Sequence, residues 1–260
     1  MKPKTELLLY WMLFIADKSM SPGFRNLNDG FESWAYRNGF LKQIHRLEAR
    51  GFLESTLDGR TGKRLHRLTR AGLLAAHGGR DPETCWAAPW DGKWRYILFD
   101  IPEKHRSKRK NLTRALQVSG CGCLQRSVWI APMLPAKLEK MAAKSETDCS
   151  KLLILTADSK GAATDRQMVI KAWDFRAINA LYQEHMLVLD QIHALKKDPD
   201  PDAFMRWSGE EHETWKAALA ADPLLPDALL PSGYLGKKAL RHHRKILRQA
   251  STLAAKIHPS

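Results

Sequence analysis

The chain has 260 residues, of which 44% are hydrophobic and 27% are charged, a composition that excludes a wholly disordered protein. Its 42 Lys and Arg outnumber its 28 Asp and Glu and give a formal net charge of +14. A surface with this excess of cations attracts anionic partners, and nucleic acid is the first candidate. Residues 1–80 hold 14 of the basic and 7 of the acidic side chains, so much of the positive field belongs to the N-terminal region.

The cysteines and the longest apolar run exclude other classes of protein. The four cysteines form no Cys-x-x-Cys pair and no dense framework, so neither a zinc site nor a disulfide scaffold is indicated. Cys121 and Cys123 flank Gly122 and are expected to be buried thiols on one strand face. The apolar run 7–16 is too short to cross a bilayer, which takes about 20 residues, and it predicts a buried first helix. We expect a cytoplasmic protein without a membrane partner.

Residues 1–80 are predicted to form a winged helix-turn-helix domain that binds double-stranded DNA. In the segment 33–50, apolar residues recur at helical spacing and Gly51 follows them, which predicts an amphipathic helix. At about 100° per residue, Lys42 and Arg46 lie almost opposite the apolar Ile44. The exposed face therefore carries hydrogen-bond donors of the kind that read base edges in the major groove.

The segments after this helix predict the wing of such a domain. Segments 52–56 and 64–69 are expected to pair as a β-hairpin, with basic side chains at its tip that contact phosphates. The alternative is that the charged helix face is merely solvated, but the order of helices and basic hairpin favours DNA binding. The candidate DNA-contacting residues are Asn38, Lys42, Gln43, His45, Arg46, Arg60, Lys63 and Arg64.

Residues 90–162 are predicted to form a small ferredoxin-like domain that follows a loop-like linker. The expected elements are a strand at 94–101, a helix at 103–119, a strand at 122–131, a helix from about 135 and a strand at 152–156. This order is typical of a split βαβ unit, whose final strand we do not assign. The helix at 103–119 is rich in Lys and Arg, which are interpreted as a solvated face, a second phosphate contact or a grip on the phosphates of a CoA-type ligand.

Residues 163–260 are predicted to form a helical domain. The helical pattern over 165–195 is interpreted as core or dimer seam, and the prolines within 223–231 impose extended chain that either packs between helices or walls an effector pocket. His242 and His243 are consecutive on the predicted last helix, and such neighbours point about 100° apart, which disfavours a shared metal ion. We therefore predict no metal ligand, no catalytic residue and no cofactor, and we assign no effector-binding residue.

Five short motifs are spread along the chain: WDGKWR at 90–95, LFDIPE at 98–103, SVWIAP at 127–132, AWDF at 172–175 and DPLLPDALLP at 222–231. Together they resemble the PaaX family, transcriptional repressors of phenylacetate breakdown and related aromatic catabolism. The resemblance implies a winged helix, a middle domain similar to the small CRISPR-associated nuclease and adaptor proteins, and a helical C-terminal domain. It also implies a homodimer that binds operator DNA and is released by an aryl-CoA thioester, notably phenylacetyl-CoA, or by another acyl-CoA.

The chain departs from the family pattern at two places. Position 234 is Tyr, where the family commonly has Trp, and the segment just before Asp222 is poor in Arg. Both departures bear on the identity of the effector more than on the fold.

The resemblance also brings an enzymatic alternative, a metal-dependent nuclease built on the middle domain. Asp100 ends the predicted strand 94–101, and in the CRISPR-associated nucleases a paired aspartate across a dimer holds a divalent metal that activates water. A lone Asp at this place is equally able to cap the helix that begins near Glu103. We therefore expect an α+β protein that acts as a ligand-responsive regulator rather than as an enzyme.

Overall fold

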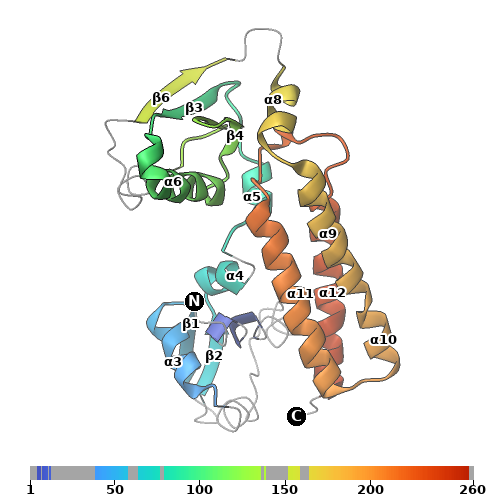
Figure 1. Cartoon of the computed structure of the whole chain (residues 1–260). Coiled ribbons are helices and arrows are strands. Elements are labelled where there is room, and N and C mark those ends of the chain that lie inside the picture. Colours follow the sequence, from blue (N-terminus) through green and yellow to red (C-terminus); the bar gives the residue numbers. More distant parts are fainter. Residues whose placement is uncertain are drawn as a thin grey trace. The chain divides into compact units, whose positions relative to one another are not determined.

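Helices and antiparallel sheets make up the computed structural model of the chain (Figure 1), in agreement with the mixture that the sequence predicts. The structure describes residues 5, 6, 8–10, 12, 39–57, 64–76, 79–135, 138, 152–158 and 164–257. The chain divides into two compact units. The first contains Met1–Asp81, Leu181–Ala217 and Leu235–Ser260, and the second contains Pro82–Ala180 and Ala218–Tyr234. Each unit combines segments of more than one predicted domain, so the division into 1–80, 90–162 and 163–260 stays a prediction.

In the first unit, helix α3 (Leu41–Ala49) follows from the apolar spacing in the sequence. Ile44 and Leu47 face the core and are 3% and 0% exposed. The helix ends before Gly51, which adopts a left-handed backbone conformation with φ 68° that is readily available to glycine. The first part of the predicted helix, 33–38, lies outside the described residues.

The predicted hairpin is confirmed as a pair of strands. Strands β1 (Leu53–Leu57) and β2 (Arg64–Leu68) pair antiparallel, with Leu53 opposite Leu68 and Leu57 opposite Arg64. The connection between the two strands, 58–63, lies outside the described residues.

Helix α4 (Arg70–Ala76) is joined to the start of the hairpin by a close backbone contact. A Cβ atom at Gly72 would lie 2.0 Å from the carbonyl oxygen of Phe52, so only glycine permits this approach. The hydroxyl of Thr69 donates to the carbonyl of Gly51 at 2.6 Å and accepts from the amide of Gly72 at 3.0 Å. One threonine therefore links the end of α3 to the start of α4.

The predicted helical pattern over 165–195 is divided into α8 (Asp165–Ala172), α9 (Phe175–Asp190) and α10 (Ile192–Lys197), and α11 (Pro201–Ala221) and α12 (Gly236–Ile257) follow. Helix α8 lies in the second unit, whereas α10, α12 and most of α9 and α11 belong to the first. Figure 1 shows α9, α11 and α12 side by side. None of the helices within the described residues combines the length and the apolar character needed to cross a bilayer.

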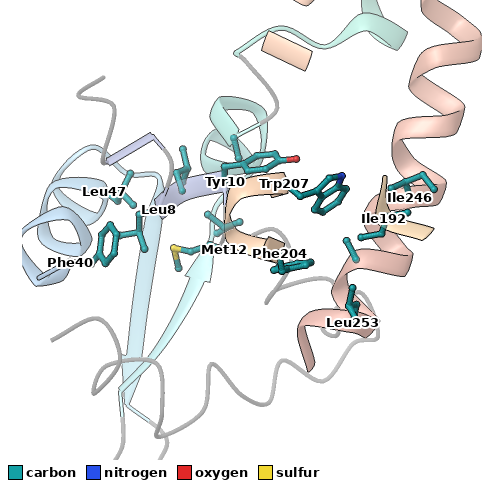
Figure 2. Close-up of a cluster of buried hydrophobic side chains, with 14 of the residues drawn as sticks. Leu8, Tyr10, Met12, Phe40, Leu47, Ile192, Phe204, Trp207, Ile246 and Leu253 are labelled. Carbon is teal, nitrogen blue, oxygen red and sulfur yellow. The ribbon is translucent and has the colours of Figure 1, made fainter. Parts of the chain in front are cut away.

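One buried hydrophobic cluster of the first unit joins the N-terminal segment to these helices (Figure 2). Its members include Leu8, Tyr10, Met12, Phe40, Leu47, Ile192, Phe204, Trp207, Ile246 and Leu253. The described residues of the apolar run 7–16 are helical and buried, as the sequence predicts. Burying each of these large side chains stabilises the unit by about 1.5–3 kcal/mol.

The second unit contains a four-stranded antiparallel sheet of order β4-β5-β3-β6. Its strands are β3 (Trp94–Phe99), β4 (Gly122–Gln125), β5 (Val128–Ala131) and β6 (Leu152–Ala157). The single strand predicted over 122–131 is wrong, because a turn at residues 126–127 makes it a hairpin. With this extra strand, the order of strands matches the ferredoxin-like arrangement β-α-β-β-α-β over the described residues.

Helix α6 (Arg106–Val118) packs on one face of this sheet (Figure 1). Its apolar residues Leu112 and Leu116 are fully buried against Ile97 and Trp129. A short 3-10 helix (Glu103–His105) precedes it, so the predicted helix start near Glu103 is a separate turn. Most of the second helix predicted for this domain, from about 135, lies outside the described residues.

The proline-rich segment forms a buried corner of the second unit. Residues 222–226 form neither helix nor strand, Leu224 has a left-handed backbone with φ 53°, and a 3-10 helix (Asp227–Leu229) follows. The extended chain predicted around Leu224 and Leu229 is therefore wrong at these two residues. The buried carboxylate of Asp222 accepts from the amide of Leu224 at 2.7 Å and from the hydroxyl of Tyr234. The ring of Tyr234 packs edge-on against Trp86 and Phe175. The tyrosine at the position where the family commonly has Trp therefore holds this corner in place.

Candidate nucleic-acid interface

The predicted recognition face lies on α3, and the structure gives the orientation of its side chains. Lys42, His45 and Arg46 are exposed, whereas Ile44 and Leu47 on the opposite side are buried. The separation between a polar and an apolar face therefore agrees with the helical spacing. Three donors on one short helix form a surface that an anionic partner can approach.

Gln43 takes a different place from the other predicted contact residues. Its side chain is half-buried, and its amide nitrogen, in the orientation that satisfies its neighbours, lies 3.2 Å from the carbonyl oxygen of Phe40 and 3.1 Å from that of Gly39. These carbonyls belong to the start of the helix. The Gln43 amide is therefore turned back toward its own backbone, and it reaches DNA only by changing rotamer.

The side chains of the remaining predicted DNA-contacting residues lie outside the described part of the structure. Arg64 begins β2, but its side chain lies outside the described residues, as do Asn38, Arg60 and Lys63. Strands β1 and β2 are described on both sides of the segment 58–63. The contacts of Asn38, Arg60, Lys63 and Arg64 with DNA stay predictions.

A polar network fixes α3 to the hairpin. Nδ1 of His45 lies 3.4 Å from one carboxylate oxygen of Glu48, and Nδ1 of the buried His66 lies 3.5 Å from the other. The hydroxyl of Ser55 donates to the Glu48 carboxylate and lies 2.7 Å from Nδ1 of His66. Helix and hairpin are therefore connected by side chains as well as by apolar packing, which orders the two elements for a common partner.

The basic helix α6, like α3, has an apolar face that is buried and a polar face that is exposed. The apolar face of α6 packs against the sheet. Its Arg106, Lys110 and Arg114 are exposed, as is Lys104 in the preceding 3-10 helix. Arg109 is half-buried and donates to the carbonyl of Ile101, so this arginine has a structural partner. The exposed cations remain available for a solvated face or a phosphate contact.

Asp100, the residue of the nuclease alternative, directly follows β3 and is exposed. Helix α6 begins at Arg106 with His105 as its N-cap and without a capping side-chain hydrogen bond, so the expectation that Asp100 caps this helix is wrong. Among the described residues, no group of three potential metal ligands includes Asp100. The structure therefore adds no support to the nuclease alternative.

The first sequence motif, 90–95, has a structural role. The Asp91 carboxylate accepts two hydrogen bonds from the guanidinium of Arg95, at 2.7 and 2.6 Å, and this pairing lowers the pKa of Asp91 to about 2. Arg95 also donates to the carbonyls of Lys93 and Pro132 at 2.8 and 2.7 Å. Arg95 thereby ties the start of β3 to the end of β5.

One cluster of polar residues was not predicted from the sequence. His185, Glu211 and His243 lie together inside the first unit, and all three are buried. His185 was interpreted as core or dimer seam and His243 as part of a basic helix. A weak signal was present, because each of the three residues stands three or four positions from large apolar residues and so falls on the apolar face of its helix. Nothing in the local spacing joins the three.

The buried thiols also depart in part from expectation. Cys121 is buried just before β4, whereas Cys123 within β4 is half-buried, and both are free thiols. Burial raises the pKa of Cys121 to about 12. Cys121 is therefore an unreactive core residue under ordinary conditions.

Comparison with known proteins gives the chain a family. The family model described as the PaaX protein central Cas2-like domain matches residues 87–169, and the model described as the PaaX-like protein C-terminal domain matches residues 173–259. The uncharacterized protein Rv0674 from Mycobacterium tuberculosis is similar in structure, with a TM-score of 0.55, 15% identity, and coverage of 95% of this chain and 96% of that one; this likeness concerns the fold alone. No curated protein matches the chain. Since the two family models together account for most of its length, the chain belongs to the PaaX family.

Proposed function

We propose that this protein is a DNA-binding transcriptional regulator whose contact with DNA is made by α3 and the β1–β2 hairpin. Membership of the PaaX family supports the class of regulator. The family models match residues 87–169 and 173–259, so they do not extend to α3. The observation that carries the proposal is the exposed face of α3, where Lys42, His45 and Arg46 lie opposite a buried apolar face.

The chemistry of this face suits the major groove. A lysine or arginine donates to the N7 and O6 acceptors of guanine, and each good contact with a base discriminates by about 1–3 kcal/mol. Lys42 and Arg46 are four residues apart and so lie one above the other on the helix surface. The two cations thereby face neighbouring positions along one groove.

The hairpin supplies the second part of the contact. Its attachment through Glu48, Ser55 and His66 means that docking α3 in the groove also positions the hairpin tip. In winged helix proteins the hairpin touches the phosphate backbone, and Arg60, Lys63 and Arg64 are the basic residues of this tip. Contacts of this kind raise affinity for all sequences and are weakened by salt.

The finer biological role extends the proposal. We propose a cytoplasmic, homodimeric repressor of an aromatic, phenylacetate-type catabolic operon, with phenylacetyl-CoA or another acyl-CoA thioester as its effector. The sequence motifs support this role, as does the family of the middle and C-terminal domains. An effector of this kind releases DNA by binding more tightly to a state whose helices no longer fit the operator. The proposed role requires no catalysis.

A DNA-binding experiment tests the proposal. We expect Lys42→Ala or Arg46→Ala to weaken binding to a DNA fragment from the upstream region of the chain's own gene by about 1–3 kcal/mol, because each removes one base contact. Lys63→Ala should weaken binding to all sequences alike and reduce its salt dependence. Fluorescence anisotropy with labelled specific and random duplexes at several salt concentrations measures both effects.

Lys171→Ala is the matched control for these variants. Lys171 is an exposed lysine of α8 in the other compact unit, so its loss should leave DNA affinity nearly unchanged. Addition of phenylacetyl-CoA should release the wild-type complex, whereas free CoA should not. Equal DNA affinity for the wild type, Lys42→Ala and Arg46→Ala would remove α3 as the recognition helix.

A further inference from the structure

Three helices of the first unit each bring one metal-binding side chain to the same buried point. His185 comes from α9, Glu211 from α11 and His243 from α12, and each has 0% exposure. The distance from Oε1 of Glu211 to Nδ1 of His243 is 2.8 Å. Nε2 of His185 lies 3.2 Å from that nitrogen and 3.7 Å from that oxygen. Two nitrogens and one oxygen therefore face one another in a region closed to solvent.

The hydroxyl of Thr214 sets which nitrogen of His185 faces this point. It donates to the backbone carbonyls of Glu210 and Glu211, both at 3.0 Å, so its one proton is already used. Toward Nδ1 of His185, 3.0 Å away, the hydroxyl can only accept. His185 therefore carries its proton on Nδ1 and directs the lone pair of Nε2 at Glu211 and His243.

A buried carboxyl group normally has a hydrogen-bond partner, and Glu211 is an exception. Neither carboxylate oxygen of Glu211 has a well-aligned hydrogen-bond donor among the described residues. An unsatisfied polar group in such a place costs about 1–3 kcal/mol, and a bound cation would remove this cost.

We propose that His185, Glu211 and His243 bind a divalent transition-metal ion, for which Zn²⁺ is the best fit. In tetrahedral zinc sites the bonds to His nitrogen and carboxylate oxygen are about 2.0–2.2 Å, which places neighbouring ligand atoms about 3.3–3.6 Å apart. The three separations of 2.8, 3.2 and 3.7 Å bracket this range. Imidazole ligands favour such a metal over Mg²⁺ or Ca²⁺, which select oxygen donors.

Neighbouring groups complete the surroundings that a metal site needs. Thr214 orients His185 in the way that outer-shell partners orient metal-binding histidines. Trp215 stacks on His243 with 4.2 Å between ring centroids and an angle of 13°, which fixes the second ring. Three protein ligands leave a fourth position for water or another donor.

The nearby histidines are directed elsewhere. His212 follows Glu211, but its ring packs on Tyr10 at 4.2 Å and its Nε2 lies 3.5 Å from a carboxylate oxygen of Glu6. His242 precedes His243, and its Nε2 lies 2.8 Å from the carboxylate of Asp190. The expectation that two consecutive histidines do not share an ion therefore agrees with their directions, and the partners of His243 come from other helices.

A metal ion at this place would join α9, α11 and α12 from inside. Its ligands are far apart in the chain, so the site exists only when the three helices are packed, and the free energy of binding adds to the stability of the folded state. The proposal is independent of DNA binding, because none of its residues lies on α3 or on the hairpin.

Metal content and affinity of the full-length chain, purified without a histidine tag, provide the test. After treatment with a chelator, we expect the wild type to take up one Zn²⁺ per chain, with a rise in its thermal midpoint. Co²⁺ should give the intense visible absorption of a tetrahedral site. A wild type that binds less than half an equivalent of both ions, or gives only the weak spectrum of an octahedral ion, would overturn the proposal.

Three variants separate this site from metal bound at the surface. We expect Glu211→Gln to lose at least tenfold in Zn²⁺ affinity, and Thr214→Val, which removes only the partner of His185, to lose about 10–100-fold. His242→Gln removes the neighbouring half-buried imidazole, which pairs with Asp190, and should keep the affinity within twofold. If Glu211→Gln fails to fold, the Zn²⁺ affinity of Thr214→Val and the cobalt spectrum of the wild type still decide whether the metal binds at this cluster. Wild-type affinity in Thr214→Val, or a loss in His242→Gln alone, would refute the assignment.

Discussion

The proposed recognition face of α3 and the buried cluster of α9, α11 and α12 hold polar side chains in opposite ways. On α3, Lys42 and Arg46 point into solvent, where water and salt screen them until a polyanion displaces the solvent. In the cluster, Glu211 and its two histidines are closed off from water, so any lone pair without a partner costs free energy. The first region therefore suits a large external partner, whereas the second requires a small one enclosed among the helices.

Two carboxyl groups show the same difference. The pKa of Asp91, which lies at the surface beside the Arg95 guanidinium, is lowered to about 2. The pKa of the buried Glu211 is raised to about 8, because burial disfavours its charged form. A neighbouring cation and burial therefore act in opposite directions on the pKa of a carboxyl group.

The largest expected effect separates the two faces of α3. We predict that Leu47→Ala lowers the free energy of unfolding by about 2–5 kcal/mol, because it leaves a cavity in the core of the first unit. Arg46→Ala, on the exposed side one residue earlier, should change it by no more than about 0.5 kcal/mol. Urea unfolding followed by circular dichroism measures both variants. Equal losses of stability in the two variants would mean that the Arg46 side chain packs in the core. The division of α3 into a buried and an exposed face would then be wrong.

The exposed and buried faces of α3 were predictable because they depend on local spacing alone, whereas the contact of the exposed face with DNA stays a prediction. Apolar positions 40, 44 and 47 fix which side of the helix is buried, and the turn-forming residues 58–62 fix the hairpin. The predicted strand at 122–131 was wrong for a local reason too, since the turn at 126–127 contains no glycine or proline that would mark it. The prolines of 222–231 indicated an apolar corner, and Leu224, Leu225 and Leu229 are buried. They did not predict its backbone, because Leu224 is left-handed and residues 227–229 form a 3-10 helix.

The metal-binding cluster was not predictable in this way. Its residues are 26 and 32 positions apart, and no spacing rule relates residues on three separate helices. A metal site was not predicted because only His242 and His243, which are adjacent in sequence, were weighed as a pair of ligands. What brings His243 to His185 and Glu211 is the packing of three helices, and that information lies in the tertiary fold.

The next effect tests whether the hairpin is held rigidly to α4. We predict that Gly72→Ala destabilises the protein by about 1–3 kcal/mol, because its Cβ would meet the Phe52 carbonyl at 2.0 Å and force the backbone to shift. Gly209→Ala is the matched control. A Cβ atom at Gly209, inside α11, meets nothing within 4 Å, so this change should stabilise by about 0.5–1 kcal/mol.

Thermal and urea unfolding of the two glycine variants give the sign of each effect. DNA binding by Gly72→Ala, measured below its unfolding transition, shows whether the close contact also positions the hairpin. A neutral or stabilising Gly72→Ala would mean that the hairpin shifts freely against α4, and the preorganised interface would lose its main structural support.

The smallest expected effect concerns the surface ion pair of the first motif. Because the pKa of Asp91 in the folded chain lies below its ordinary value of 3.8, the pair stabilises the folded state above about pH 4, and this contribution is lost as the pH falls through about 2. Arg95→Gln removes the guanidinium, and we expect the Asp91 midpoint to return toward 3.8. Carboxyl chemical shifts from NMR during an acid titration measure it, with Arg176→Gln, an exposed arginine of α9, as control. If the Asp91 midpoint were the same in the wild type and Arg95→Gln, a neighbouring cation would not govern this carboxyl. The pKa of Asp91 could then no longer be contrasted with that of Glu211, which is governed by burial.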